Sequence, residues 1–206
     1  MKILLVSANT LTAPYPVYPI GLDYVAGALG EAHTVEILDL NTAAPAGTIA
    51  SALDRFAPDL IGISLRNIDN TDIVDVQSYL AGYRDLIREI RARSAAPVVL
   101  GGSGFTIFPR RILKAVGADY GIVGEGERLA HLVDALEQGT DPAAVAGVVQ
   151  AGSESGKGAT LPPPLERPLR RAFRAGRAHT DFYLKHGAML NRLSKRGCPF
   201  RCSYCT

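Results

Sequence analysis

Leu60-Ile61-Gly62-Ile63-Ser64-Leu65 is a short, almost continuously apolar run that is typical of a strand covered on both faces. Comparable runs, bounded by turn residues, predict four more strands: Lys2–Ser7, Thr34–Leu40, Pro97–Leu100 and Asp119–Val123. Helical spacing between them predicts helices at Ile20–Gly30, Thr48–Phe56, Val76–Arg93, Pro109–Val116 and Gly126–Gln138. This alternation predicts an α/β fold for residues 1–140, with a doubly wound, Rossmann-like sheet of five parallel strands.

The chain changes character after residue 140. We expect residues 141–185 to be a linker with a small hairpin, formed by Val145–Gln150 and Thr160-Leu161, and a helical turn at Asp181–Leu184. The glycine-rich tip at 152–158 lacks the spacing of a phosphate loop, and Pro162-Pro163-Pro164 stiffens the chain after it. Residues 186–206 are expected to begin another domain, with its first strand at Met189–Lys195.

Composition excludes several classes of function. The 206 residues hold 22 basic and 20 acidic side chains, for a net charge of +2, which gives no reason to expect a nucleic-acid partner. No apolar run is long enough for a membrane span, and the apolar run at the start of the chain is too short for a signal peptide. Clustered cysteines without a secretion signal indicate a cytoplasmic protein.

The carboxyl ends of the predicted strands indicate where a ligand binds, because open α/β sheets bind ligands at that edge. The first of these loops has no glycine before Gly21, which argues against a nicotinamide site. The glycines after the fourth strand would instead let a bulky ligand lie against bare backbone. The candidate contacts follow the third, fourth and fifth strands: Ser64, Arg66, Asn67, Gly101, Gly102, Ser103, Gly104, Phe105, Gly124, Glu125 and Gly126.

The three cysteines of the chain, Cys198, Cys202 and Cys205, have the spacing C-x3-C-x2-C. Three such thiolates can hold a [4Fe–4S] cluster and leave one iron open to a small molecule. A zinc site would require a fourth ligand at a regular spacing, and a disulfide would leave one thiol over. We therefore interpret the motif as a cluster loop.

The cysteine motif resembles that of the radical SAM superfamily. Together with Pro19–Leu22, Ser64–Asn70, Gly101–Gly104 and Gly121–Glu127, it is similar to the cobalamin-dependent radical SAM enzymes, in which a B12-binding domain precedes the barrel. The resemblance implies that residues 186–206 carry the first strand and cluster loop of a partial (β/α) barrel. It further implies S-adenosylmethionine at the open iron, with Tyr204 against its adenine, and cobalamin at the contacts above.

The sequence departs from this family in the loop after the first strand. Many cobalamin domains carry there a histidine that coordinates cobalt, and residues 8–21 contain none. We expect cobalamin to bind base-off without a histidine ligand, its nucleotide tail passing Ser64 and Gly101-Gly102. Arg66 stands where family members place leucine, near the lower face of the ring. Alternatively, Arg66 only pairs with Asp69 or Asp72 to shape its loop.

The function that the resemblance implies is a methyltransferase acting on an unactivated carbon. One SAM methylates the reduced cobalamin, a second yields a 5′-deoxyadenosyl radical, and the substrate radical takes the methyl group from methylcobalamin. Alternatives are a cyclase or rearrangement enzyme of the same family, a radical SAM enzyme in which this domain is only a scaffold, and a non-catalytic corrinoid-binding module. A small-molecule substrate and an electron donor such as flavodoxin or ferredoxin are expected partners, and this part alone is expected to be inactive.

Overall fold

The computed structural model describes residues 1–42, 48–70, 72–153, 162–165, 171–172, 177–187 and 192–193, without the side chains of 177–179. Cys198, Cys202, Cys205 and Tyr204 lie outside the described residues, as do Thr160-Leu161 and most of Met189–Lys195. The cluster loop and the start of a barrel therefore stay predictions.

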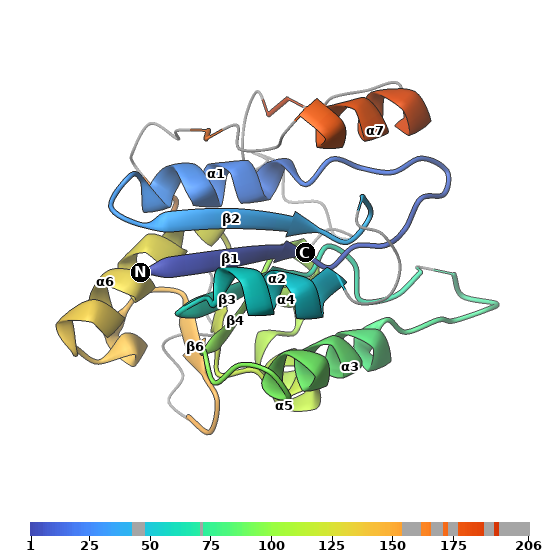
Figure 1. Cartoon of the computed structure of the whole chain (residues 1–206). Coiled ribbons are helices and arrows are strands. Elements are labelled where there is room, and N and C mark those ends of the chain that lie inside the picture. Colours follow the sequence, from blue (N-terminus) through green and yellow to red (C-terminus); the bar gives the residue numbers. More distant parts are fainter. Residues whose placement is uncertain are drawn as a thin grey trace.

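One sheet of six strands forms the centre of the described part of the chain, in the order β2-β1-β3-β4-β5-β6 (Figure 1). Five strands are parallel: β1 (Lys2–Ser7), β2 (Thr34–Asp39), β3 (Leu60–Ser64), β4 (Val98–Gly101) and β5 (Tyr120–Ile122). Each lies within one or two residues of its predicted position.

The five predicted parallel strands are present, but the sheet has a sixth strand that was not predicted to join it: β6 (Val148–Gln150) pairs antiparallel to β5. Its expected hairpin partner, Thr160-Leu161, lies outside the described residues, so that pairing stays a prediction. Gly147 has a φ of 87°, and its carbonyl accepts a hydrogen bond of 2.8 Å from the amide of Val123. This turn sends the next residues back along β5, where Val148 and Val149 become buried.

Two layers of helices cover the sheet (Figure 1). Helices α1 (Ile20–Leu29) and α6 (Leu129–Gln138), the latter preceded by the 3₁₀ turn η1 (Gly126–Arg128), bury apolar side chains against one face. Helices α2 (Thr48–Phe56), α3 (Leu80–Arg91) and α5 (Pro109–Val116) pack on the other. The short elements α4 (Ser103–Ile107) and η2 (Pro142–Ala144) connect strands to helices, and α7 (Arg177–Gly187) lies over α1.

Helix α3 begins at Leu80, four residues later than predicted, because the preceding residues form a structured loop. Asp69 and Ser78 form a bridge, and Asn70 Oδ1 accepts the amide of Gln77 at 3.0 Å. Side chains that bond the backbone in this way favour turns over helix. The predicted start of the helix, Val76, therefore lies in this loop and is 70% exposed.

The strand order reverses between β1 and β3, because β2 lies on one side of β1 and all later strands lie on the other. In such 2-1-3-4-5 sheets the crevice for ligands lies at this switch point, outside the carboxyl ends of the strands. None of the helices in the described part of the chain is long and apolar enough to span a membrane.

Candidate functional site

A cavity of about 620 Å³ lies at the switch point, between the sheet and the layer of α1 and η1. Its size falls in the range of small-molecule sites. The residues that line it come from the sheet, from α1, from the turn before α6 and from the later part of the chain: Leu5, Gly21, Leu22, Val25, Gly62, Ile63, Ser64, Val99, Leu100, Gly101, Gly102, Ile122, Gly124, Glu125, Gly126, Glu127, Leu129, Pro162, Pro164 and Leu193.

The floor of the cavity is a pair of small residues on neighbouring strands. Ser64 of β3 and Gly101 of β4 are register partners. Because side chains alternate along a strand, Gly101 shares a face with Val99, which packs in the core beneath α1 and α6. A Cβ added to Gly101 would meet no atom within 4 Å, so the cavity begins directly at its backbone. Glycine here leaves room for a bulky group.

The side walls are α1 and the loop after β5. Gly21, Leu22 and Val25 line the cavity from α1, and a Cβ at Gly21 would also enter open space. On the opposite wall, Gly126 lies against α1: its Cβ would come within 2.9 Å of Val25 Cγ2. The two walls therefore meet tightly at one point and leave space over the carboxyl ends of β3 and β4.

Several of the residues predicted from sequence line this cavity together: Ser64, Gly101, Gly102, Gly124, Glu125 and Gly126. Arg66, Asn67, Ser103, Gly104 and Phe105 are not among the lining residues. Phe105 is fully buried in the core on the opposite face of the sheet, where a Cβ on Gly121 would lie 2.0 Å from its ring. Phe105 is therefore a core residue.

Gly102 and Gly104 also allow a close contact between two loops. Gly102 has a φ of 96°, and a Cβ there would lie 2.5 Å from the Leu65 carbonyl oxygen. A Cβ on Gly104 would lie 3.0 Å from the Arg66 carbonyl oxygen. These two glycines let the loop after β4 approach the loop after β3, which leaves Gly101 as the bare backbone of the cavity.

Arg66 lies exposed at the carboxyl edge of the sheet, and its loop is held through its backbone. Ser103 Oγ donates to the Arg66 carbonyl at 3.0 Å, and Tyr83 Oη donates to the Asn67 carbonyl at 2.6 Å. Burial, with a smaller effect from Tyr79, raises the pKa of Tyr83 to about 12, so the phenol stays a donor. The ion pairs within the described residues do not include one from Arg66 to Asp69 or Asp72.

A buried polar network beside the cavity was not found from the sequence. Asp23 of α1 is 1% exposed, and its carboxylate accepts hydrogen bonds from Tyr18 Oη at 3.0 Å and from Arg171 Nε at 2.8 Å. Burial raises the pKa of the Asp23 carboxyl above its usual value, and the bonds from Arg171 and Tyr18 oppose that shift. The sequence signal for this network is a gathering of basic residues between Arg167 and Arg177.

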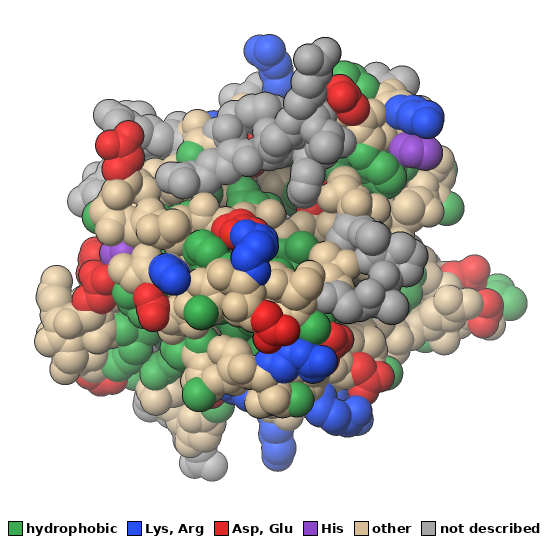
Figure 2. Space-filling model, viewed as in Figure 1, with side chains coloured by type: hydrophobic (Ala, Val, Ile, Leu, Met, Phe, Trp, Pro, Cys, Tyr) green, Lys and Arg blue, Asp and Glu red, His purple; other side chains and the backbone are tan. Residues whose placement is uncertain are grey.

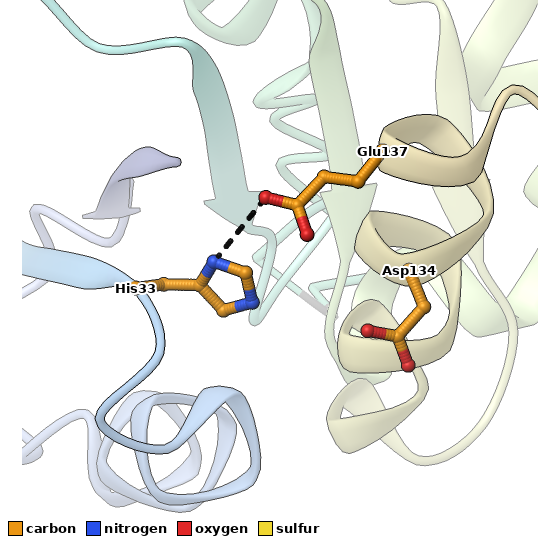
Figure 3. Close-up of side chains that lie close together, drawn as sticks. All are labelled: His33, Asp134 and Glu137. Atoms are coloured by element: carbon orange, nitrogen blue, oxygen red, sulfur yellow. Dashed lines mark ion pairs between the residues drawn. The ribbon is translucent and has the colours of Figure 1, made fainter.

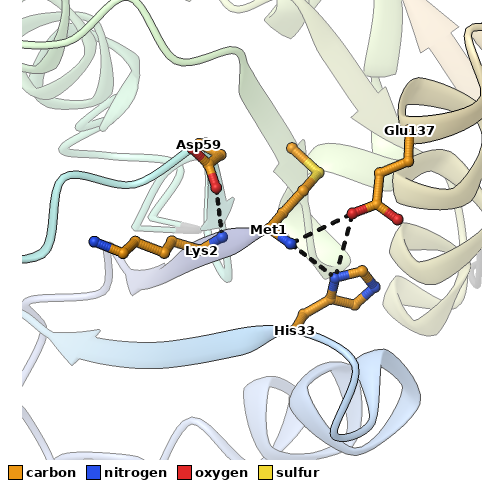
Figure 4. A network of polar contacts seen from close by, with 5 residues as sticks. All are labelled: Met1, Lys2, His33, Asp59 and Glu137. Carbon is orange, nitrogen blue, oxygen red and sulfur yellow. Dashed lines mark hydrogen bonds and ion pairs between the residues drawn. The ribbon is translucent and has the colours of Figure 1, made fainter.

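A second polar cluster lies at the opposite, amino-terminal edge of the sheet (Figures 3 and 4). His33 Nδ1 lies 3.7 Å from Glu137 Oε1, and Asp134 is close enough for the three side chains to be potential metal ligands. The Met1 ammonium already pairs with Glu137 at 3.3 Å, and both carboxylates are exposed. We interpret this cluster as an ion-pair network that fixes the start of β1 against α6 (Figure 4).

The residues of the cavity suit the expected corrinoid tail, because they leave open space at bare backbone. Two neighbouring strands present a serine and a bare glycine to it, and two glycine positions open directly into it. Among the described residues no histidine lines the cavity. On the face in Figure 2, basic and acidic side chains are interspersed over the surface.

Residues 6–133 match the family model of the B12 binding domain. Among curated proteins, the chain is 26% identical over 244 residues to a tryptophan 2-C-methyltransferase of Streptomyces laurentii, which covers 92% of this chain and 41% of that protein. It is 30% identical over 221 residues to an uncharacterized methyltransferase of Pyrococcus horikoshii, covering 100% of this chain and 45% of that protein. The chain thus spans less than half the length of these relatives.

Solved structures show the same similarity. The radical S-adenosylmethionine methyltransferase TsrM from Kitasatospora setae, with cobalamin and a [4Fe–4S] cluster bound, has 31% identity and a TM-score of 0.68, over 74% of this chain and 29% of that one. The cobalamin-dependent radical enzyme OxsB, with aqua-cobalamin bound, has 20% identity and a TM-score of 0.58, over 71% of this chain and 20% of that one. At this identity the second match concerns the fold alone.

Proposed function

Because this chain belongs to the B12-binding domain family and is related to the cobalamin-dependent radical SAM enzymes, we propose that it is the corrinoid-binding part of a radical SAM methyltransferase. In this proposal the bound cobalamin supplies a methyl carrier, and the cluster with S-adenosylmethionine supplies the radical chemistry that activates an unactivated carbon. Cys198, Cys202 and Cys205 would hold the cluster, and Tyr204 would contact SAM.

The residues of the cavity would bind and orient the corrinoid. The tail would enter between α1 and the Gly124–Glu127 loop and lie on the floor made by Ser64 and Gly101. The Ser64 hydroxyl is the polar group of that floor, and apolar residues such as Leu5 and Leu129 exclude water around it. The cavity suits one part of a corrinoid, so the ring itself would lie outside it, at the carboxyl edge that carries Arg66.

One observation carries the link between cavity and cluster motif. Leu193 lines the cavity and precedes Cys198 by five residues. Five residues can span at most about 18 Å. This short separation in sequence supports a shared reaction of corrinoid and cluster. A small-molecule substrate, and an electron donor such as flavodoxin or ferredoxin, complete the proposal.

The test is visible absorption of the chain after anaerobic reconstitution with cobalamin, iron and sulfide. We expect both a corrinoid spectrum and the broad absorption of an iron–sulfur cluster. Replacing Cys198, Cys202 and Cys205 together by Ala should remove the cluster absorption and leave the corrinoid bound, because the cavity is built by other residues.

The other outcomes distinguish the competing functions. A corrinoid spectrum without any cluster would favour a non-catalytic carrier module. A cluster without a corrinoid would favour a radical SAM enzyme in which this domain is only a scaffold. A triple variant that stays folded but loses the corrinoid would contradict the proposal that the corrinoid and the cluster bind at separate sites.

A further inference from the structure

The chain returns to the cavity after it has left the sheet. Pro162 and Pro164 line the cavity, although they follow strand β6 by more than ten residues. The other lining residues come mainly from the sheet, from α1 and from the Gly124–Leu129 segment. We name the two described segments 162–165 and 171–172 the strap.

The first attachment of the strap is to the wall formed by η1. The Leu165 amide donates a hydrogen bond of 2.6 Å to Glu125 Oε2, and Glu125 itself lines the cavity. The guanidinium of Arg128, whose residue is 5% exposed, donates to the Pro163 carbonyl. Hydrogen bonds to charged groups are the stronger class, so this end is held firmly.

The second attachment is to the opposite wall, α1. Arg171 Nε donates to Asp23 Oδ2 at 2.8 Å, and the Ala172 amide donates to the Asp23 carbonyl at 3.0 Å. Asp23 directly follows Gly21 and Leu22, which line the cavity. The Arg171 guanidinium also lies 5.6 Å from the centre of the Tyr18 ring.

Asp23 is a buried carboxylate whose charged partner comes from the strap. A carboxylate that is 1% exposed is costly unless it is paired and hydrogen-bonded. An apolar residue would pack at this position of α1 without that cost. The side chain that compensates it, Arg171, comes from 148 residues later in the chain and is 27% exposed. The pair therefore serves to attach the later segment.

We propose that the strap is a clasp for the corrinoid: it joins the two walls of the cavity, opens to admit or release the cofactor, and is fastened by the Asp23–Arg171 pair. The proposal rests on the proposed function, because it assigns the cavity to cobalamin. A clasp and a simple ligand contact predict different effects on the rate constants of binding. Loosening it speeds both entry and release, whereas loss of a contact speeds release alone.

The experiment measures both rate constants for hydroxocobalamin by visible absorption, with stopped-flow mixing for binding and dilution for release. Arg171→Met keeps the apolar stem and removes the charge. We expect each rate constant to rise about tenfold, since a hydrogen-bonded ion pair of this kind is lost. Arg171→Met combined with Asp23→Asn removes the pair without leaving a buried charge, and it should give the same result.

The matched control is Arg88→Met, which breaks the exposed pair of Arg88 with Asp85 on α3, on the far face of the sheet. It should leave both rate constants unchanged. The clasp proposal is wrong if the Arg171 variants have unchanged rate constants, or if they release the corrinoid faster without binding it faster. Either result would leave the proposal of corrinoid binding intact. If the unmodified chain binds no corrinoid, the proposed function fails first, and the clasp with it.

Amide hydrogen exchange provides a readout that needs no cofactor. The amides of Leu165 and Ala172 belong to the two different attachments. If the strap opens as one unit, Arg171→Met should accelerate exchange at both amides by a similar factor. Acceleration at Ala172 alone would show that the attachments open independently, which would contradict the proposal.

Discussion

The hydroxyl of Tyr183 donates a hydrogen bond of 2.5 Å to Asp39 Oδ2, across 144 positions of the sequence. Tyr183 is fully buried and packs edge-on against Tyr18, with ring centres 5.3 Å apart. Asp39 belongs to a row of register partners across the sheet: Asp39, Ser7, Ser64 and Gly101. Helix α7 thus fills one end of this row, and the cavity occupies the other.

Removing the Tyr183 hydroxyl should destabilise the fold. In Tyr183→Phe, the buried Asp39 carboxylate loses one donor and keeps the bond of 3.1 Å from the Asn41 amide. We expect the free energy of unfolding, measured by urea denaturation, to fall by roughly 1–3 kcal/mol. Tyr15→Phe, at a residue that is 44% exposed, is the control and should change little. Equal stability of both variants would mean that α7 is not docked through this bond.

Filling the floor of the cavity should abolish corrinoid binding without unfolding the protein. The side chain in Gly101→Leu would project into the cavity, since a Cβ there meets no protein atom. Gly82→Leu makes the same chemical change at an exposed position of α3 that is equally open. We expect corrinoid affinity to fall at least about a hundredfold in the first variant and to stay unchanged in the second. Unaltered binding by Gly101→Leu would place the corrinoid elsewhere.

Arg66 should influence the potential of cobalt if the ring lies at the carboxyl edge of the sheet. A cation near the ring disfavours the higher oxidation states, so Arg66→Leu should lower the cobalt reduction potentials and Arg66→Lys should retain them. Two unit charges ~4 Å apart interact by about 4 kcal/mol at an effective dielectric of ~20. A quarter of that corresponds to a shift of about 40 mV, measurable by spectroelectrochemistry. Unchanged potentials in the leucine variant would leave Arg66 with a role in its loop alone.

Deprotonation of Tyr83 should lower the free energy of unfolding at alkaline pH. Its folded pKa of about 12 lies above the usual 10. Between these values the folded protein keeps a proton that the unfolded chain has lost, so this contribution is fully present below pH 10 and falls as pH rises toward 12. Urea unfolding of the unmodified chain and of Tyr83→Phe at about pH 9 and about pH 11.5 is the test. At the lower pH, Tyr83→Phe should be less stable than the unmodified chain. Between the lower and the higher pH, the free energy of unfolding should fall less in Tyr83→Phe than in the unmodified chain.

Much of the fold could be predicted from the sequence, because strands and helices follow local periodicity. The run at Leu60–Leu65 predicted β3, and the alternation around it predicted the other parallel strands. Ser64 and Gly101 could be placed in the site for the same reason: the carboxyl ends of parallel strands meet at one edge. The loop after β5 followed from that rule too.

Only the tertiary structure decided what local pattern does not encode. The direction of β6 depends on a turn at Gly147, and the packing of Gly102, Gly104 and Phe105 depends on which loops come into contact. Arg171 and Tyr183, which donate hydrogen bonds to Asp23 and Asp39, lie more than 140 positions away from them. A carboxylate in a sequence looks the same whether it will face water or be buried, and only the folded chain brings Arg171 and Tyr183 to these two.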